Sequence, residues 1–169
     1  MPSAETQLQG LTHVQELERR FIKSRVFLQG DVFYDRNRRI LYGGDKASWG
    51  SPDIIVLCGA LADAITLQEW CYKHDHQLFF RSEMQPLSSV LSTYQKRPVC
   101  VCDIGPMDDI EVYPVRAVAY VKGGISIEEV ADFAAWSGLV LEAGYSDKSK
   151  SLIDFARGSY ALSVLLSNC

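Results

Sequence analysis

Residues 51–60, Ser-Pro-Asp-Ile-Ile-Val-Leu-Cys-Gly-Ala, determine the predicted fold. Ile54 to Leu57 form an unbroken apolar run rich in β-branched residues, which is typical of a strand covered on both faces. Gly59 interrupts the run, and apolar residues then recur at helical spacing as far as Trp70. A second apolar run occupies residues 77–80. We therefore predict a β-α-β unit over residues 54–80.

The pattern outside this unit predicts further helices and strands. Residues 6–23 have the spacing of an amphipathic helix. Residues 25–35 and 39–42 favour two strands of a hairpin, because both are rich in apolar and aromatic residues and a polar turn joins them. Later in the chain we predict helices at 86–96, 126–136 and 147–166, and strands at 99–102, 112–121 and 139–141. Ser126 and Glu129 have the spacing of a capping box that opens the 126–136 helix.

This order of elements indicates the α/β or α+β class, with a single mixed β-sheet flanked by helices, an N-terminal helix and a β-hairpin. The length of 169 residues predicts one globular domain. The longest apolar runs are too short for a membrane helix, and the first residues lack the basic and apolar regions of a signal peptide. Five cysteines are an odd number that cannot all pair within the chain, so we expect reduced thiols and a cytoplasmic protein.

Cys58 is the candidate nucleophile. It follows a buried strand and precedes Gly59 and a helix, and the N-terminus of a helix lowers the pKa of a thiol. An enzyme of this kind would need a base, for which His74 and His76 are candidates, and an orienting carboxylate, for which Asp103 is the candidate. We predict the set Cys58, His76 and Asp103. The alternative is that Cys58 fills a small space in the core.

The sequence predicts neither a metal nor a cofactor. Cys71, His74 and His76 lie close together, and Cys100 and Cys102 form a second pair, but this is no familiar zinc-ligand spacing. Residues 43–46, Gly-Gly-Asp-Lys, are not a phosphate loop, and no Gly-x-Gly-x-x-Gly run is present. These observations argue against a nucleotide site of the standard kind.

A basic segment suggests a binding surface. Residues 19–39 contain seven basic residues and only two acidic ones. Arg36, Arg38 and Arg39 at the tip of the predicted hairpin, with Trp49 in the following loop, are candidates for binding a partner. If the partner were a nucleic acid, the guanidinium groups would contact phosphate. The overall charge of -4 gives no support to that choice.

Because no complete catalytic set is visible, we predict a non-catalytic binding or regulatory protein that acts through protein-protein contacts and forms a homo-oligomer. A small cysteine-dependent hydrolase or transferase that uses Cys58 is the alternative, and a nucleic-acid-binding protein that uses residues 19–39 is the second alternative. Whether the chain is an enzyme stays open at this point. No membrane association is expected.

Overall fold

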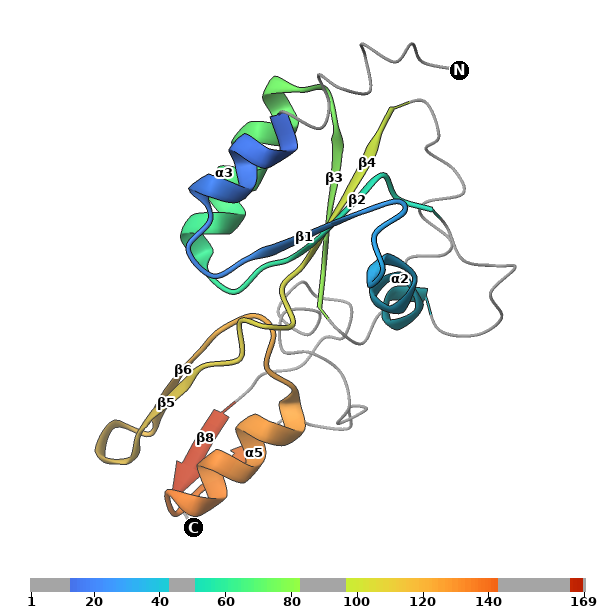
Figure 1. Cartoon of the computed structure of the whole chain (residues 1–169). Helices are drawn as coiled ribbons and strands as arrows, with labels where there is room; N and C mark the ends of the chain where they lie inside the picture. The colour runs from blue at the N-terminus through green and yellow to red at the C-terminus, as the bar shows by residue number, and fades with distance from the viewer. Residues whose placement is uncertain (1–12, 43–50, 83–96, 143–164, 169) are drawn as a thin grey trace, which may run out of the picture.

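The computed structural model describes residues 13–42, 51–82, 97–142 and 165–168 (Figure 1). Its centre is a four-stranded sheet of β1 (Arg25–Leu28), β2 (Ile54–Leu57), β3 (Gln77–Arg81) and β4 (Val99–Asp103). The strand order is β1-β2-β4-β3. β1 runs antiparallel to β2, whereas β2, β4 and β3 are mutually parallel. The mixed sheet and the α+β class are thus confirmed. β4 lies between the two strands of the predicted β-α-β unit.

Helices cover both faces of this sheet. A helical segment at residues 13–20 and α3 (Leu61–Lys73) lie on one face, and α2 (Tyr34–Tyr42) lies on the other (Figure 1). Successive residues of β2 point to opposite faces, so Val56 joins the core under α3 while Ile55 joins the core under α2. Both faces are therefore buried, which explains why β2 is apolar at every position.

The predicted N-terminal hairpin is wrong: its first strand, predicted at residues 25–35, ends at Leu28, and its second strand, predicted at residues 39–42, is helical. The structure places these residues in the last turn of α2. Tyr34 and Asn37 are buried three residues apart, which is the spacing of one helix face. The Tyr34 hydroxyl donates to the carbonyl of Pro52 and thereby ties α2 to the start of β2. This long-range contact favours a helix where the local pattern favoured a strand.

The single strand predicted at 112–121 is also wrong, because this region forms a hairpin. β5 (Ile110–Tyr113) pairs antiparallel with β6 (Val118–Val121), and a 3-10 turn at Pro114–Arg116 joins them. Pro114 begins the turn, and Ala117 ends it with a φ of 50°, in the left-handed region. Both residues interrupt an extended backbone, so the chain reverses direction here.

The last described elements are α5 (Ile127–Trp136), β7 (Leu139–Glu142) and β8 (Leu165–Asn168). Ser126 and Glu129 form the predicted capping box. β7 pairs antiparallel with β8. The end of the helix predicted at 147–166 is wrong, since residues 165–168 are a strand. The rest of that helix and the helix predicted at 86–96 lie outside the described residues. No described helix is both long enough and apolar enough to cross a bilayer.

Candidate functional site

The carboxyl edge of the parallel strands is the first candidate site. β2, β4 and β3 run in the same direction, so their carboxyl ends meet at one edge, with Cys58, Asp103 and Arg81 there. Open α/β sheets bind their ligands outside this edge. From the end of β4 the chain leads on to β5, β6 and α5 (Figure 1). The edge therefore lies at the junction between the sheet and the second half of the described chain.

Cys58 is fully buried at this edge. Its amide donates to the Asp103 carbonyl at 2.7 Å, and its Sγ lies 3.3 Å from the Ala60 carbonyl oxygen. A hydrogen bond from the Cys102 thiol favours the Cys58 thiolate and, with help from the Ser24 hydroxyl and against burial, lowers the pKa of Cys58 to about 6. The Cys58 thiol is therefore polarised, but it is not exposed to solvent.

The structure brings Asp103 beside Cys58 and separates His76 from both. Asp103 is the register partner of Leu57, which immediately precedes Cys58. His76 precedes β3, so it lies at the amino edge of the parallel strands, opposite Cys58. Its Nδ1 donates to the His74 carbonyl at 2.9 Å. The predicted set of Cys58, His76 and Asp103 therefore does not assemble, because parallel strands place the start of one far from the end of its neighbour.

The side chains of Arg81 and Asp103 form a buried ion pair at the carboxyl edge. The Arg81 Nε lies 3.9 Å from an Asp103 carboxylate oxygen, and the two side chains are 1% and 4% exposed. Asp103 also accepts a hydrogen bond from the Gly105 amide at 2.8 Å. Arg81 was not among the predicted site residues. Its position at the end of an apolar run was the only sequence signal for it.

The backbone closes this edge tightly. The Ile104 amide donates to the Arg81 carbonyl at 2.7 Å. A Cβ added to Gly124 would lie 2.3 Å from the Ile104 carbonyl oxygen and 2.4 Å from that of Gly105. A Cβ at Gly59 would lie 2.7 Å from the Lys23 carbonyl oxygen. Both glycines are therefore needed for close packing of the chain on itself.

Asp63, in the first turn of α3, is a buried carboxylate with three donors. The amides of Ile22 and Lys23 donate to it at 2.8 and 2.9 Å, and the Ser24 hydroxyl donates at 2.7 Å. Burial alone would raise the pKa of Asp63, but these hydrogen bonds outweigh it and lower the pKa below its usual value. Asp63 joins the chain before β1 to α3, which is a structural role.

The predicted binding residues Arg36 and Arg38 lie on α2 rather than on a hairpin tip. Arg36 is exposed. Arg38 donates to the Asp35 carboxylate and to the Ser51 hydroxyl, both at 2.8 Å. The backbone of Arg39 is helical, and its side chain and Trp49 lie outside the described part. The prediction that these arginines gather at the tip of a hairpin is therefore wrong.

Cysteine and histidine residues do not form a metal centre in the described part of the chain, where no group of three or more potential ligands is found. Cys71 and Cys100 are buried, and a hydrogen bond with Cys71 raises the pKa of the Cys100 thiol well above its usual value. A buried thiol that stays protonated, as that of Cys100 does, acts as a core residue.

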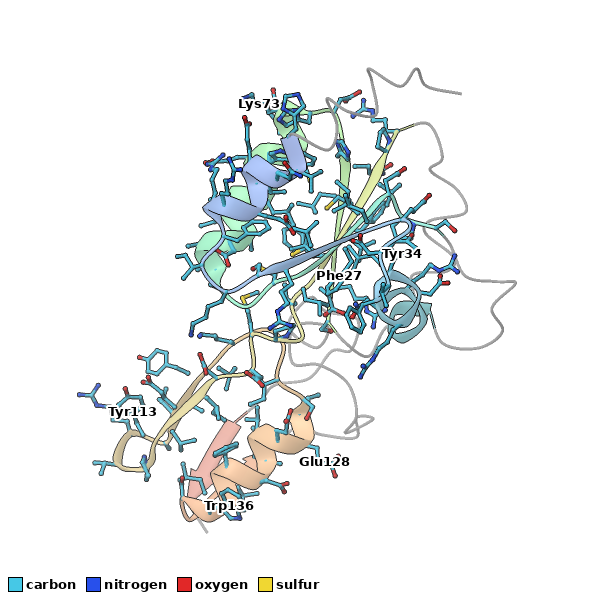
Figure 2. All side chains as sticks on the ribbon, viewed as in Figure 1. Phe27, Tyr34, Lys73, Tyr113, Glu128 and Trp136 are labelled. Carbon is cyan, nitrogen blue, oxygen red and sulfur yellow. The ribbon has the colours of Figure 1, made fainter. Side chains whose placement is uncertain are left out.

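A second candidate site is the outer face of the β5-β6 hairpin. The inward-facing residues Ile110, Val112, Ala119 and Val121 are half-buried, whereas the opposite face is exposed. That exposed face carries Tyr113, Val118 and Tyr120 beside Glu111, and the tip carries the fully exposed Val115. The rings of Tyr113 and Tyr120 meet edge to face at 5.6 Å. Tyr113 points away from α5 (Figure 2).

This outer face was missed by the sequence analysis, because residues 112–121 were assigned to one strand. In a solvated hairpin the outward positions are normally polar. Contiguous exposed apolar side chains mark interaction surfaces more often than single ones do. The alternation that identifies this face becomes visible in the sequence only when the reversal at residues 114–117 is recognised.

Solved structures with a similar fold include an oxidase and a dehydrogenase. One is 6-hydroxy-D-nicotine oxidase from Arthrobacter nicotinovorans, which is 20% identical over 73% of this chain and 26% of its own, with a TM-score of 0.60. A variant of Phl p 4, a glucose dehydrogenase, is 16% identical over 78% and 28%, with a TM-score of 0.65. A variant of berberine bridge enzyme is 17% identical over 81% and 29%, with a TM-score of 0.66.

At identities of 20% or less, these similarities show only that the fold is shared. The chain spans between a quarter and a third of the length of these three proteins. No protein-family model matches the sequence. No curated protein matches it either.

Proposed function

We propose that this chain is a non-catalytic binding protein that acts through protein-protein contacts, and that the outer face of the β5-β6 hairpin is its contact surface. The observation that carries the proposal is the apolar character of that face, with Tyr113, Val118 and Tyr120 exposed side by side. Burying these side chains against a partner would remove apolar surface from water at about 25 cal/mol per Å². A second copy of the chain is the partner to test first.

The carboxyl edge supports the same proposal. The edge at which α/β enzymes hold ligands is filled here by the Arg81–Asp103 ion pair, the buried Cys58 and the close packing of Gly124. A thiol enzyme would need a base near Cys58, and in the described part His76 lies at the other edge. The cysteine-dependent and nucleic-acid-binding functions stay untested predictions, as does the cytoplasmic location.

A redox-cofactor module is the second candidate, favoured by the fold shared with the oxidase and dehydrogenase structures. Variants of Phl p 4 are described either as a glucose dehydrogenase or as a glucose oxidase. A flavin is the organic cofactor that both accepts hydride and reacts with O₂. We infer that a flavin dinucleotide is the group to test.

The described residues do not fit the pyrophosphate of such a dinucleotide. The positive charge of Arg81 is offset by Asp103, and Gly59 and Gly124 pack against the chain's own carbonyl groups. A pyrophosphate site needs backbone amides that a glycine-rich turn leaves open to the ligand. Residues 82–86, Ser-Glu-Met-Gln-Pro, which follow β3, contain no glycine. For this reason the binding function ranks first.

Native mass spectrometry of the purified chain, with and without added FAD, separates the two candidates. We expect a concentration-dependent dimer and no FAD adduct, and we expect the Tyr113→Ser/Tyr120→Ser variant to be monomeric. Ile65→Ser, which removes an exposed apolar side chain from α3, is the matched control and should still dimerise. A stoichiometric FAD adduct, lost in Arg81→Ala, would instead support the cofactor module. Dimerisation that is unaffected by the double variant would contradict the assignment of the hairpin face.

A further inference from the structure

All three histidines of the chain lie around one tryptophan, at the end of the molecule where α3 turns into β3. The ring centroids of His13 and His74 are 4.6 Å apart. Trp70 lies 4.7 Å from the His74 ring and 4.8 Å from the His76 ring. The label of Lys73 in Figure 2 marks this end, which is remote from α5. We call this group the histidine cluster; its members are His13, Trp70, His74 and His76.

The histidine cluster joins two segments that are far apart in the sequence. His13 begins the described helical segment 13–20, and the other members lie on or just after α3. The Trp70 Nε1 donates to the His13 carbonyl at 3.3 Å. Val14 and Leu17 of segment 13–20 are buried in the same core as Leu67 and Trp70 of α3. The cluster therefore lies at one end of the contact that holds segment 13–20 on α3.

The charges around His74 come from every element packed there. Segment 13–20 contributes His13 and Glu16, α3 contributes Lys73, and the turn before β3 contributes His76. Burial lowers the pKa of His74, and the charges of His13, Lys73 and His76 lower it further, while Glu16 acts in the opposite direction. Two ion pairs involve residues adjacent to the histidine cluster in the sequence: Asp75 pairs with Arg97 at 3.2 Å, and Glu69 pairs with Arg20 at 3.8 Å.

We propose that the histidine cluster is an acid-sensitive clasp, which holds segment 13–20 on α3 at neutral pH and releases it as the imidazole of His74 becomes protonated. Protonation of His74 would place a positive charge on a half-buried ring whose centroid lies 4.6 Å from that of His13, on the residue next to Lys73. Burial of His74 and the neighbouring positive charges outweigh the opposing charge of Glu16, so protonation of His74 is disfavoured while segment 13–20 stays on α3.

The direction of the pH effect follows from proton linkage. A histidine with a lowered pKa in the folded state binds fewer protons there than in the opened state. The stability that it contributes is complete above the usual histidine pKa of about 6.5 and is lost as the pH falls below that value. Release of segment 13–20 would uncover Leu67 and Trp70, both of which are buried at neutral pH. Acidification would thus create a new apolar surface on α3.

The test is an NMR titration of the full chain between pH 4.5 and 8, combined with amide hydrogen exchange. Three imidazole signals are expected, since the chain has three histidines. In His13→Gln, the pKa of His74 should rise, because a like charge has been removed. Between pH 7.5 and 5.5, amide protection factors in segment 13–20 should fall by more than about twofold, because the opened state binds more protons than the closed one.

Variants and internal probes decide the outcome. In His13→Gln/His74→Gln the loss of protection should shrink to less than about twofold, whereas Gln15→Asn, an exposed change on the same segment, should behave as the parent does. Amides of β2 and β4 should keep their protection at both pH values. An unchanged His74 pKa in His13→Gln would overturn the proposal. So would an equal loss of protection throughout the sheet, because the release would then not be local.

Discussion

At the scale of single residues, Asp63 has the clearest stabilising role. Its carboxylate receives three hydrogen bonds from residues 22–24 while being almost completely buried. Asp63→Ala would leave those donors without an acceptor, and we expect the free energy of unfolding to fall by about 3 kcal/mol. Urea denaturation at pH 7 measures this loss. Asp132→Ala, at an exposed position of α5, is the control and should change stability by less than about 0.5 kcal/mol.

The pH dependence provides a second check on Asp63. Its pKa is lowered in the folded state, so the stability that it contributes is present above its usual pKa of about 4. That contribution is lost as the pH falls through the lowered pKa. The difference between the parent chain and Asp63→Ala should therefore shrink when unfolding is repeated near pH 3. A constant difference at both pH values would show that the hydrogen bonds to the ionised carboxylate are not its cause.

At the scale of an element, α5 depends on its N-terminal cap. The Ser126 hydroxyl accepts from the Glu129 amide at 3.1 Å, and the Glu129 carboxylate accepts from the Ser126 amide at 2.9 Å. We expect Ser126→Ala to lower the free energy of unfolding by about 1 kcal/mol in a urea titration, since one helix donor loses its acceptor. Ser137→Ala, at the other end of α5, removes only an exposed bond to Phe133 and serves as the control. Equal losses in both variants would argue against a specific capping effect.

At the scale of the whole molecule, Gly124 connects the four-stranded sheet to the hairpin and α5. Its amide donates to the Met107 carbonyl at 2.8 Å, and a Cβ there would meet three carbonyl oxygens of residues 104–107 within 2.7 Å. Backbone atoms cannot move aside as a flexible side chain can. We expect Gly124→Ala to cost about 3 kcal/mol or more and to lower the melting temperature in calorimetry accordingly.

Gly138 provides the matched control for this substitution. Its φ is +72°, and a Cβ there would have nothing within 4 Å. Gly138→Ala therefore reports the left-handed backbone strain alone, which costs about 1 kcal/mol. If Gly124→Ala were no more destabilising than Gly138→Ala, the tight junction between the sheet and α5 would not contribute to stability as the structure indicates.

Two elements of the structure could be predicted from the sequence. The apolar run at Ile54–Leu57 predicted a strand buried on both faces, and the capping residues Ser126 and Glu129 predicted the start of α5. Both signals are local: a β-strand between two layers needs apolar residues at every position, and a capping box needs two residues three apart. For the candidate site, the sequence predicted that Cys58 follows a buried strand and that Asp103 ends a second one. That these two strands are neighbours in the sheet is shown by the structure.

Sequence alone determined a mixed sheet flanked by helices in the α/β or α+β class, the central strands and the cap of α5, because each depends on residue spacing within single elements. Tertiary structure decided the helix at residues 34–42, the reversal at 114–117, the separation of His76 from Cys58 and the gathering of three histidines around Trp70. These features depend on contacts between residues distant in the chain, such as the bond from Tyr34 to Pro52 and the insertion of β4 between β2 and β3. No local pattern encodes them, since their free energy is gained only after the elements have packed together.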